Sequence, residues 1–306
     1  MKKGSQSRCS MHKRINQKYY YLMLLPALIY LIVFEFIPML GLVMAFQNFK
    51  PGKGFLHSDW VGLANFKRLF ASSDTFELFR NTLVISTGKI LVKTITSIVF
   101  AILLSEITTK WLKKYVQTVT YLPHFVSWVI ISQLVYIVLG NDGFVNQALA
   151  FFGFEPVNFM SSNDTFQGML IGTHTWKEFG YGSIVYLAAI TSVDPGLYEA
   201  AALDGANWWQ RVRHVMIPAI IPIVVLILAR DVSSVLSAGF DQVFNLYNAR
   251  VYDTGDILDT YIYRVGLQGR QFSLSTALGM FKSVIGIIMM LSVNWLSTKT
   301  LKRSIF

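Results

Sequence analysis

The sequence predicts an all-α membrane protein with six transmembrane helices and with both termini in the cytoplasm. Of its 306 residues, 53% are hydrophobic and only 14% are charged, whereas soluble domains carry about 25% charged residues. The apolar residues gather into six long segments, and a helix of about 20 apolar residues crosses the hydrocarbon core of a bilayer. Lysine and arginine are distributed unevenly between the connecting segments, which predicts the orientation.

The six apolar segments follow one another without a low-complexity linker, so we predict one transmembrane domain over residues 19–298. Cytoplasmic tails flank it at residues 1–18, which are basic, and at residues 299–306. The first segment is too long and too poorly flanked for a cleaved signal peptide, and we expect a retained helix. The segments cover residues 19–47, 81–107, 118–139, 167–190, 215–238 and 272–297.

The net charge of +10 does not indicate nucleic-acid binding, because most Lys and Arg residues of the connecting segments lie on one side of the predicted membrane. With a cytoplasmic N-terminus, the inner segments carry 14 Lys and Arg residues, at positions 1–18, 110–114, 211–213 and 299–303. The longer outer loops carry eight. This positive-inside bias predicts a multi-pass protein of the cell membrane. It also places residues 199–222 in the cytoplasm.

Residues 199–222, EAAALDGANWWQRVRHVMIPAIIP, begin as a polar stretch between two apolar segments. Asp194 and Pro195 fit an N-cap and the first position of a helix. Asp204 and Gly205 then fit a helix stop, because glycine readily adopts positive φ. A second short helix is expected from about Ala206. The sequence therefore predicts a helical hairpin within a cytoplasmic loop at residues 191–214.

Two interpretations of this hairpin follow from its residues alone. Trp208 and Trp209 are large apolar side chains of the kind that dominate protein interfaces. The three alanines at 200–202 would let a partner approach the backbone closely. Alternatively, the tryptophans sit at the lipid headgroups and the hairpin only lies on the membrane.

The motif EAA-x3-G resembles the signature loop of permeases in binding-protein-dependent ABC importers. Its longer form, EAA-x-LDGA-x-WWQR followed by PAIIP, is similar to the carbohydrate class of maltose-type permeases. FDQVFNLYN, VYDTGDILDTYIYR and STALGMFKSVIG resemble a branch linked to oligosaccharide and polysaccharide uptake. The core motif matches Glu199, Ala200, Ala201 and Gly205, and its extension matches Asp204 and Pro218.

The resemblance implies that this loop is a coupling helix that binds in a cleft of an ATPase subunit. It further implies a second permease in a heterodimer, two ATPase subunits, an extracellular solute-binding protein and a carbohydrate substrate. The chain contains no G-x-x-x-x-G-K-[ST] motif, and its five histidines lack metal-ligand spacing. We therefore expect no enzyme activity, cofactor or metal on this chain, and ATP with Mg²⁺ on the ATPase subunits.

Ionisable residues within membrane spans are costly and usually functional. Four of the cations, Lys89, Lys177, Arg230 and Lys282, share with Glu35 a depth of roughly 12–17 Å from the outer end of their spans. They could line a polar cavity for a hydrated substrate, or neutralise one another and hold the helices together. Five cations against three carboxylates mildly favour an acidic ligand. The residues are Glu35, Lys89, Lys93, Lys177, Glu178, Arg230, Asp231 and Lys282.

Aromatic and planar polar side chains are further candidates for sugar recognition. Trp176 stands beside Lys177 and could provide an apolar platform for a sugar ring. Asp241, Asn245 and Tyr247, just beyond the fifth span, could donate and accept hydrogen bonds. Interfacial anchoring and loop scaffolding are the alternatives. Loops 47–80 and 141–166 are candidates for contact with an external binding protein.

The favoured interpretation is the permease subunit of an ATP-driven carbohydrate importer, with an oligosaccharide as substrate. An ion-coupled secondary transporter would instead use Glu35, Glu178 or Asp231 as its proton site and would favour related inverted halves. A membrane enzyme acting on lipid-linked sugars would need a carboxylate or histidine cluster at one interface. The sequence shows neither feature.

Overall fold

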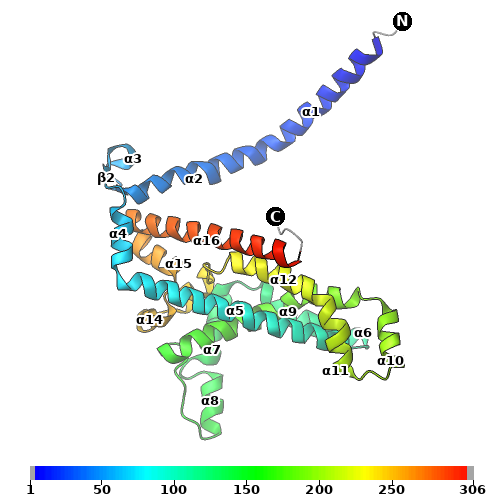
Figure 1. Cartoon of the computed structure of the whole chain (residues 1–306). Coiled ribbons are helices and arrows are strands. Elements are labelled where there is room, and N and C mark those ends of the chain that lie inside the picture. Colours follow the sequence, from blue (N-terminus) through cyan, green and yellow to red (C-terminus); the bar gives the residue numbers. More distant parts are fainter. Residues whose placement is uncertain (1–3, 302–306) are drawn as a thin grey trace.

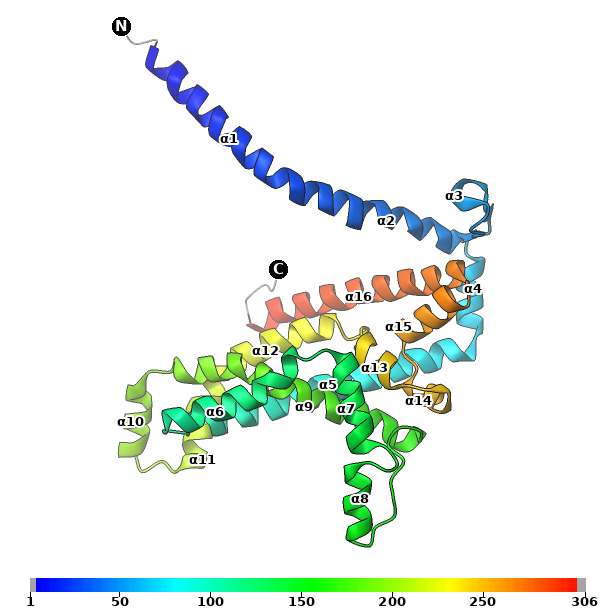
Figure 2. The same cartoon turned by 180° about the vertical axis from the view of Figure 1, so that it is seen from behind.

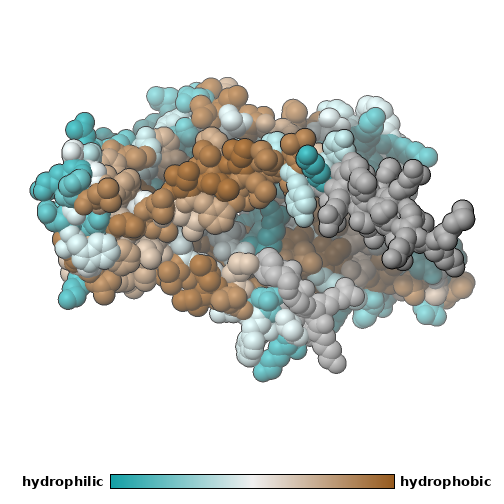
Figure 3. Space-filling model, turned by 90° about the horizontal axis from the view of Figure 1, so that it is seen from above, coloured by the Kyte–Doolittle hydropathy of each residue, from teal (hydrophilic) through white to brown (hydrophobic). Residues whose placement is uncertain are grey.

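The computed structural model describes the backbone of residues 4–301 and the side chains of residues 18–295, 298 and 299. Long helices lie side by side, and the N-terminal helix extends away from them (Figure 1). The side chains of residues 1–17 in the predicted basic tail, and residues 302–306 of the C-terminal tail, lie outside this description. Seen from above, apolar side chains cover the middle of the molecule and hydrophilic ones gather toward its ends (Figure 3).

The N-terminal helix is continuous through changes of helical type. It comprises α1 (Gly4–Leu31), the π-helix η1 (Ile32–Phe36), α2 (Ile37–Met39) and the 3-10 helix η2 (Leu40–Phe46). Only its end reaches the other helices, where η2 packs on α16 (Phe272–Leu301). A short antiparallel pair follows, β1 (Gln47–Asn48) and β2 (Asp59–Trp60), with α3 (Gly54–His57) between the strands, and then α4 (Ala64–Ala71).

The centre of the bundle is the pair α5 (Ser73–Ser105) and α9 (Asn163–Thr191), against which α12 (Ile217–Ser233) packs. Five helical stretches among the described residues are long and apolar enough to cross a membrane. They are Lys18–Phe46, Ser73–Ser105, Trp128–Phe151, Trp208–Ser233 and Phe272–Trp295. Helix α9 is 29 residues long but is more polar than these stretches.

The third apolar segment is not one helix. It is divided into α6 (Lys110–Tyr121), the 3-10 turn η3 (Leu122–Phe125) and α7 (Trp128–Leu139). Pro123 lacks an amide hydrogen for an α-helical bond, and the backbone becomes extended at Val126 and Ser127, where Ser127 starts α7 as an N-cap that accepts from the Ile130 amide. The prediction of one helix over 118–139 is therefore wrong. After Gly140 the chain turns into α8 (Phe144–Phe151), which projects from the bundle (Figure 2).

Helices α6 and α9 approach closely at Gly180. A Cβ atom at this position would lie 2.2 Å from the carbonyl oxygen of Thr120. We expect Gly180→Ala to push the helices apart and to destabilise the protein by about 1–3 kcal/mol. The matched control is Gly172→Ala on the same helix, where an added Cβ meets no atom within 4 Å. A thermal melt in detergent should show a lower midpoint for the first variant only, and equal midpoints would contradict the close approach.

The segment between α12 and α16 folds back onto α5. The Asn81 side chain donates to the Asp253 carbonyl at 2.9 Å, and the Leu258 amide donates to the Thr82 hydroxyl at 3.0 Å. Asp256 is buried and pairs with Arg264. These bonds hold α14 (Tyr252–Gly255), α15 (Leu258–Tyr261) and the π-helix η6 (Ile262–Gln268) in place. The segment begins with α13 (Phe240–Leu246) and η5 (Ala249–Val251).

Candidate functional site

The polar stretch predicted from the sequence forms α10 (Pro195–Leu203), α11 (Trp208–Arg211) and the π-helix η4 (Val212–Met216). Both views place α10 and α11 at the opposite end of the long helices from α4 (Figures 1 and 2). The Asp194 carboxylate accepts from the Gly196 amide at 2.9 Å, and Pro195 follows it. The predicted helix start is therefore confirmed.

Gly205 ends α10 in the left-handed conformation, with φ +74°. The Ala206 amide donates to the Ala201 carbonyl at 2.9 Å, and the Gly205 amide donates to the Ala202 carbonyl at 3.1 Å. This pair of bonds is a Schellman motif. Asn207 and Gln210 then form a capping box that begins α11. The predicted stop and the predicted second helix are both confirmed.

The two tryptophans of α11 face different surroundings. Trp208 is half-buried and packs against the cluster that contains Leu104, Val212 and Met216. Trp209 is 72% exposed, and Leu203 at the end of α10 is 90% exposed. Of the other predicted contact residues, Ala201 is half-buried, and Glu199, Ala200, Asp204, Gly205 and Pro218 are exposed. The hairpin thus has one side packed on the helices and another that presents apolar side chains.

Tyr198 connects α10 to the helices. Its ring packs against the same cluster as Trp208. Burial raises the pKa of Tyr198, with a further contribution from Glu106 and an opposing one from Arg211. Glu106, Tyr198 and Glu199 line a cavity of about 470 Å³ between the end of α5 and α10. Tyr198 and Trp208 are therefore two aromatic residues that pack the hairpin against the helices.

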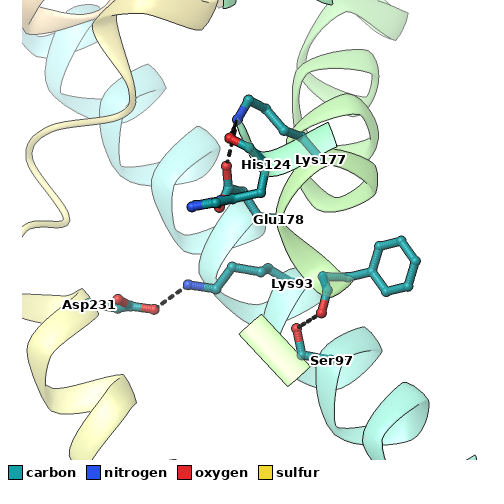
Figure 4. Close-up of polar contacts among 7 residues, drawn as sticks. Lys93, Ser97, His124, Lys177, Glu178 and Asp231 are labelled. Carbon is teal, nitrogen blue, oxygen red and sulfur yellow. Dashed lines mark hydrogen bonds and ion pairs between the residues drawn. The ribbon is translucent and has the colours of Figure 1, made fainter. Parts of the chain in front are cut away.

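Several intramembrane charges form ion pairs between helices (Figure 4). Lys93 of α5 lies 2.6 Å from Asp231 of α12. Glu178 of α9 lies 3.2 Å from Lys177 and 2.8 Å from the ring of His124 in η3. The Lys177 ammonium also donates to the His124 carbonyl at 2.6 Å. These contacts join α5 to α12 and α9 to η3.

Lys89 differs from these residues because its hydrogen-bond partner is neutral. It is only 4% exposed and donates to the carbonyl of Ala238 at 2.6 Å. Lys282 pairs with Asp259, whereas Arg230 is exposed. Glu35 is also exposed and lies on the helix that stands apart from the bundle. Glu35 therefore meets none of the other charges within the part of the chain that the structure describes, and its expected depth in the membrane stays a prediction.

Two adjoining polar cavities collect part of the predicted set. The first, of about 190 Å³, is lined by Lys89, Lys93, His174 and Asp231. The second, of about 430 Å³, is lined by Asp259 and Lys282. Ser234 and Ser237 line both cavities, so the two spaces are neighbours. The arrangement offers ammonium and hydroxyl donors to a polar ligand at this level of the bundle.

The predicted sugar-recognition residues lie elsewhere. Trp176 lines a separate apolar cavity of about 670 Å³ between α7 and α9. Asp241 is exposed, and the Asn245 side chain donates to its carbonyl at 2.7 Å. Burial raises the pKa of Tyr247 to about 12. The structure does not bring these residues to the polar cavities.

Two residues that pair with the predicted intramembrane charges were not predicted from the sequence. Asp259, the partner of Lys282, lies in α15 outside the predicted spans. His124 follows Pro123 in η3, where the third segment is interrupted. Pro123 was a usable signal for a change of helix at His124, because proline has no amide hydrogen for an α-helical bond. No spacing rule connects Asp259 with Lys282.

Comparison with known proteins agrees with this geometry. Residues 93–302 match the family described as "Binding-protein-dependent transport system inner membrane component". The chain is 43% identical to the polygalacturonan/rhamnogalacturonan transport system permease protein YteP of Bacillus subtilis (strain 168), over 94% of this chain and 90% of that protein. It is 37% identical to Protein LplB of the same organism, over 95% and 92% of the two chains.

A solved structure has a very similar fold. It is the crystal structure of a bacterial ABC transporter involved in the import of the acidic polysaccharide alginate. One chain of that structure superposes on this chain with a TM-score of 0.86 and 37% sequence identity. The match covers 95% of this chain and 99% of the other. A second structure shows a bacterial alginate ABC transporter in complex with an alginate pentasaccharide-bound periplasmic protein, with a TM-score of 0.85. The chain therefore belongs to the family of inner-membrane permease components of binding-protein-dependent transport systems.

Proposed function

We propose that this chain is the transmembrane permease subunit of an ATP-driven importer for oligosaccharides derived from acidic polysaccharides. An external solute-binding protein delivers the sugar. The observation that carries the proposal is the combination of the α10–α11 hairpin at one end of the bundle with lysine-lined polar cavities inside it. The names of the relatives support the substrate class, since they include polygalacturonan and alginate.

Six transmembrane segments and cytoplasmic termini fit this role. Helix α9 lies along α5, which is one of the apolar stretches of spanning length. We take α9 as the sixth span, because its polar residues are turned toward neighbouring helices, as in the contacts of Lys177 and Glu178 with His124 of η3. The excess of lysine and arginine on the α10–α11 side supports a cytoplasmic location for that end.

The hairpin serves as the coupling element in this proposal. Leu203 and Trp209 present exposed apolar surface that an ATPase cleft can cover. Tyr198 and Trp208 pack on the helices and transmit the displacement. ATP and Mg²⁺ bind to two ATPase subunits, and this chain contributes no residue to hydrolysis. Closure of the ATPases favours one orientation of the cavity, and transport requires different binding free energies in the two orientations.

A second permease completes the pathway. The apolar window of the first span, within Lys18–Phe46, has none of its residues buried within this chain. A helix of this length packed against a second permease would bury one side while leaving the other to lipid. A heterodimer of two unlike permeases is the arrangement that we propose.

Purification of the complex from its native membrane tests the proposal. We expect two permeases, two ATPase subunits and a bound uronate-containing oligosaccharide, identified by mass spectrometry. If the chain purified without partner subunits and transported its solute only in the presence of a proton or ion gradient, the alternative would be favoured. That alternative is an ion-coupled secondary transporter of a polar solute. Glu178 or Asp231 would then be its titrating group.

A further inference from the structure

We propose that the 190 Å³ cavity between α5, α9 and α12 is a subsite for the carboxylate of a uronate sugar, with the Lys89 ammonium as its charged partner. This inference rests on the proposed function and adds a binding group to it. The neutral donors of the subsite are Ser86, Ser237 and His174, which line the same cavity.

The first argument is the charge of Lys89. Its side chain is buried, and no carboxylate oxygen of the described residues lies within 4.0 Å of its nitrogen. One of the three N–H groups of the Lys89 ammonium donates a hydrogen bond to the carbonyl oxygen of Ala238. A buried ammonium without a counter-charge is costly, at several kcal/mol per ion. A ligand carboxylate would offset that cost.

The second argument is the charge balance of the cavity. Lys93 and Asp231 neutralise each other at 2.6 Å. With both lysines protonated, Lys89 is the remaining net positive charge among the groups that line the space. A neutral oligosaccharide gains only hydrogen bonds here, whereas a uronate gains a charge-assisted bond, which is about twice as strong.

The third argument is shape. A volume of about 190 Å³ holds a carboxylate group with part of a sugar ring, but not an oligosaccharide. The adjoining cavity of about 430 Å³ continues past Ser234 and Ser237 toward Lys282 and Asp259. Neighbouring rings can occupy this second space, where hydroxyl groups of serines meet hydroxyl groups of the sugar.

A purely structural role for Lys89 gives a different expectation. The chain reverses after Ala238 at Gly239, with φ +86°, and a Cβ atom on Gly239 would lie 3.3 Å from the Lys89 nitrogen. Lys89 could therefore serve only to hold this bend between α12 and α13. Glutamine at position 89 keeps a hydrogen-bond donor but removes the charge, so the two roles can be separated.

The test uses the complete importer in proteoliposomes with a pair of probes, trigalacturonate and its methyl ester. Lys89→Gln and Lys89→Met should raise the half-saturating concentration of the acid at least about tenfold. Uptake of the ester should change less than about twofold. The ratio of acid uptake to ester uptake is compared between each variant and the wild type. The binding protein is the same in both, so its own preference for acid or ester does not affect this comparison. Lys114→Met, an exposed lysine of α6, is the control and should leave the ratio unchanged.

Equal losses for acid and ester in Lys89→Gln, or no loss for either, would overturn the subsite while leaving the importer assignment intact. If the wild-type complex takes up neither probe with ATP, the proposed function for acidic sugars fails, and the subsite fails with it. If Lys89→Met reduces the yield of the complex, the acid and ester uptake of Lys89→Gln alone is compared with that of the wild type.

Discussion

Trp209→Ala should lower ATP-driven uptake at least tenfold while leaving the melting temperature of the permease unchanged. Trp209 is 72% exposed and contributes little to the packing of the helices. Exposed tryptophans that become buried at an interface often contribute about 2 kcal/mol or more to binding. Loss of that contribution should release the ATPase subunit, which co-purification measures directly.

Trp208→Ala is the matched comparison, because it removes the same side chain one position earlier. Trp208 packs against the cluster of Leu104, Val212 and Met216, so its loss leaves a cavity. We expect destabilisation by about 2 kcal/mol, seen as a lower melting temperature, since large-to-small changes in cores cost a few kcal/mol. If both variants lost the ATPase without a change in melting temperature, the division of the hairpin into two sides would be wrong.

Lys93→Met should destabilise the permease by about 3 kcal/mol, because it leaves the Asp231 carboxylate without its partner. The pair is short, at 2.6 Å, and its side chains are 21% and 17% exposed. Breaking a buried pair from one side costs about 3–5 kcal/mol, and partial exposure places this pair at the lower end. The double variant Lys93→Met/Asp231→Leu should recover most of the loss, since no unpaired charge remains.

Melting temperatures of the two single variants and the double variant form a double-mutant cycle. A recovery in the double variant identifies the pair as a contact that holds α5 to α12. Additive losses would instead show that the two residues act independently. The same cycle on Lys282 and Asp259 extends the test to α16 and α15.

Most of the long helices could be predicted from the sequence because an apolar stretch of about 20 residues is itself the signal of a membrane span. The interruption of the third segment depends on local features, Pro123 and the N-cap Ser127, which a hydropathy pattern does not weigh. The separate position of the first helix could not be predicted. Its sequence is apolar on all sides, and apolarity does not distinguish contact with lipid from contact with a second chain.

In the candidate site, too, local features could be predicted from the sequence, whereas contacts that depend on packing could not. The start of α10 at Asp194 and its end at Gly205 follow from capping and backbone conformation, which are local properties of the sequence. The opposite environments of Trp208 and Trp209 depend on how the hairpin packs against α5 and η4. The pairing of Lys282 with Asp259 depends on the fold of the segment after α12, for which the sequence carries no periodic signal.

We propose that the α10–α11 hairpin transmits the work of an ATPase, and the Gly205→Asp variant probes this role. An L-residue in the left-handed conformation costs about 1–2 kcal/mol. The new carboxylate also joins the exposed Asp204 beside the proposed docking surface. A Cβ atom here meets nothing within 4 Å, so the membrane-spanning helices should fold normally.

The measurement is ATP-driven uptake together with ATPase retention, in membranes that contain equal amounts of wild-type or Gly205→Asp permease. The account predicts normal insertion of the variant, loss of the ATPase subunit from the complex and at least a tenfold fall in uptake. Normal uptake with the ATPase retained would contradict the coupling role of this hairpin.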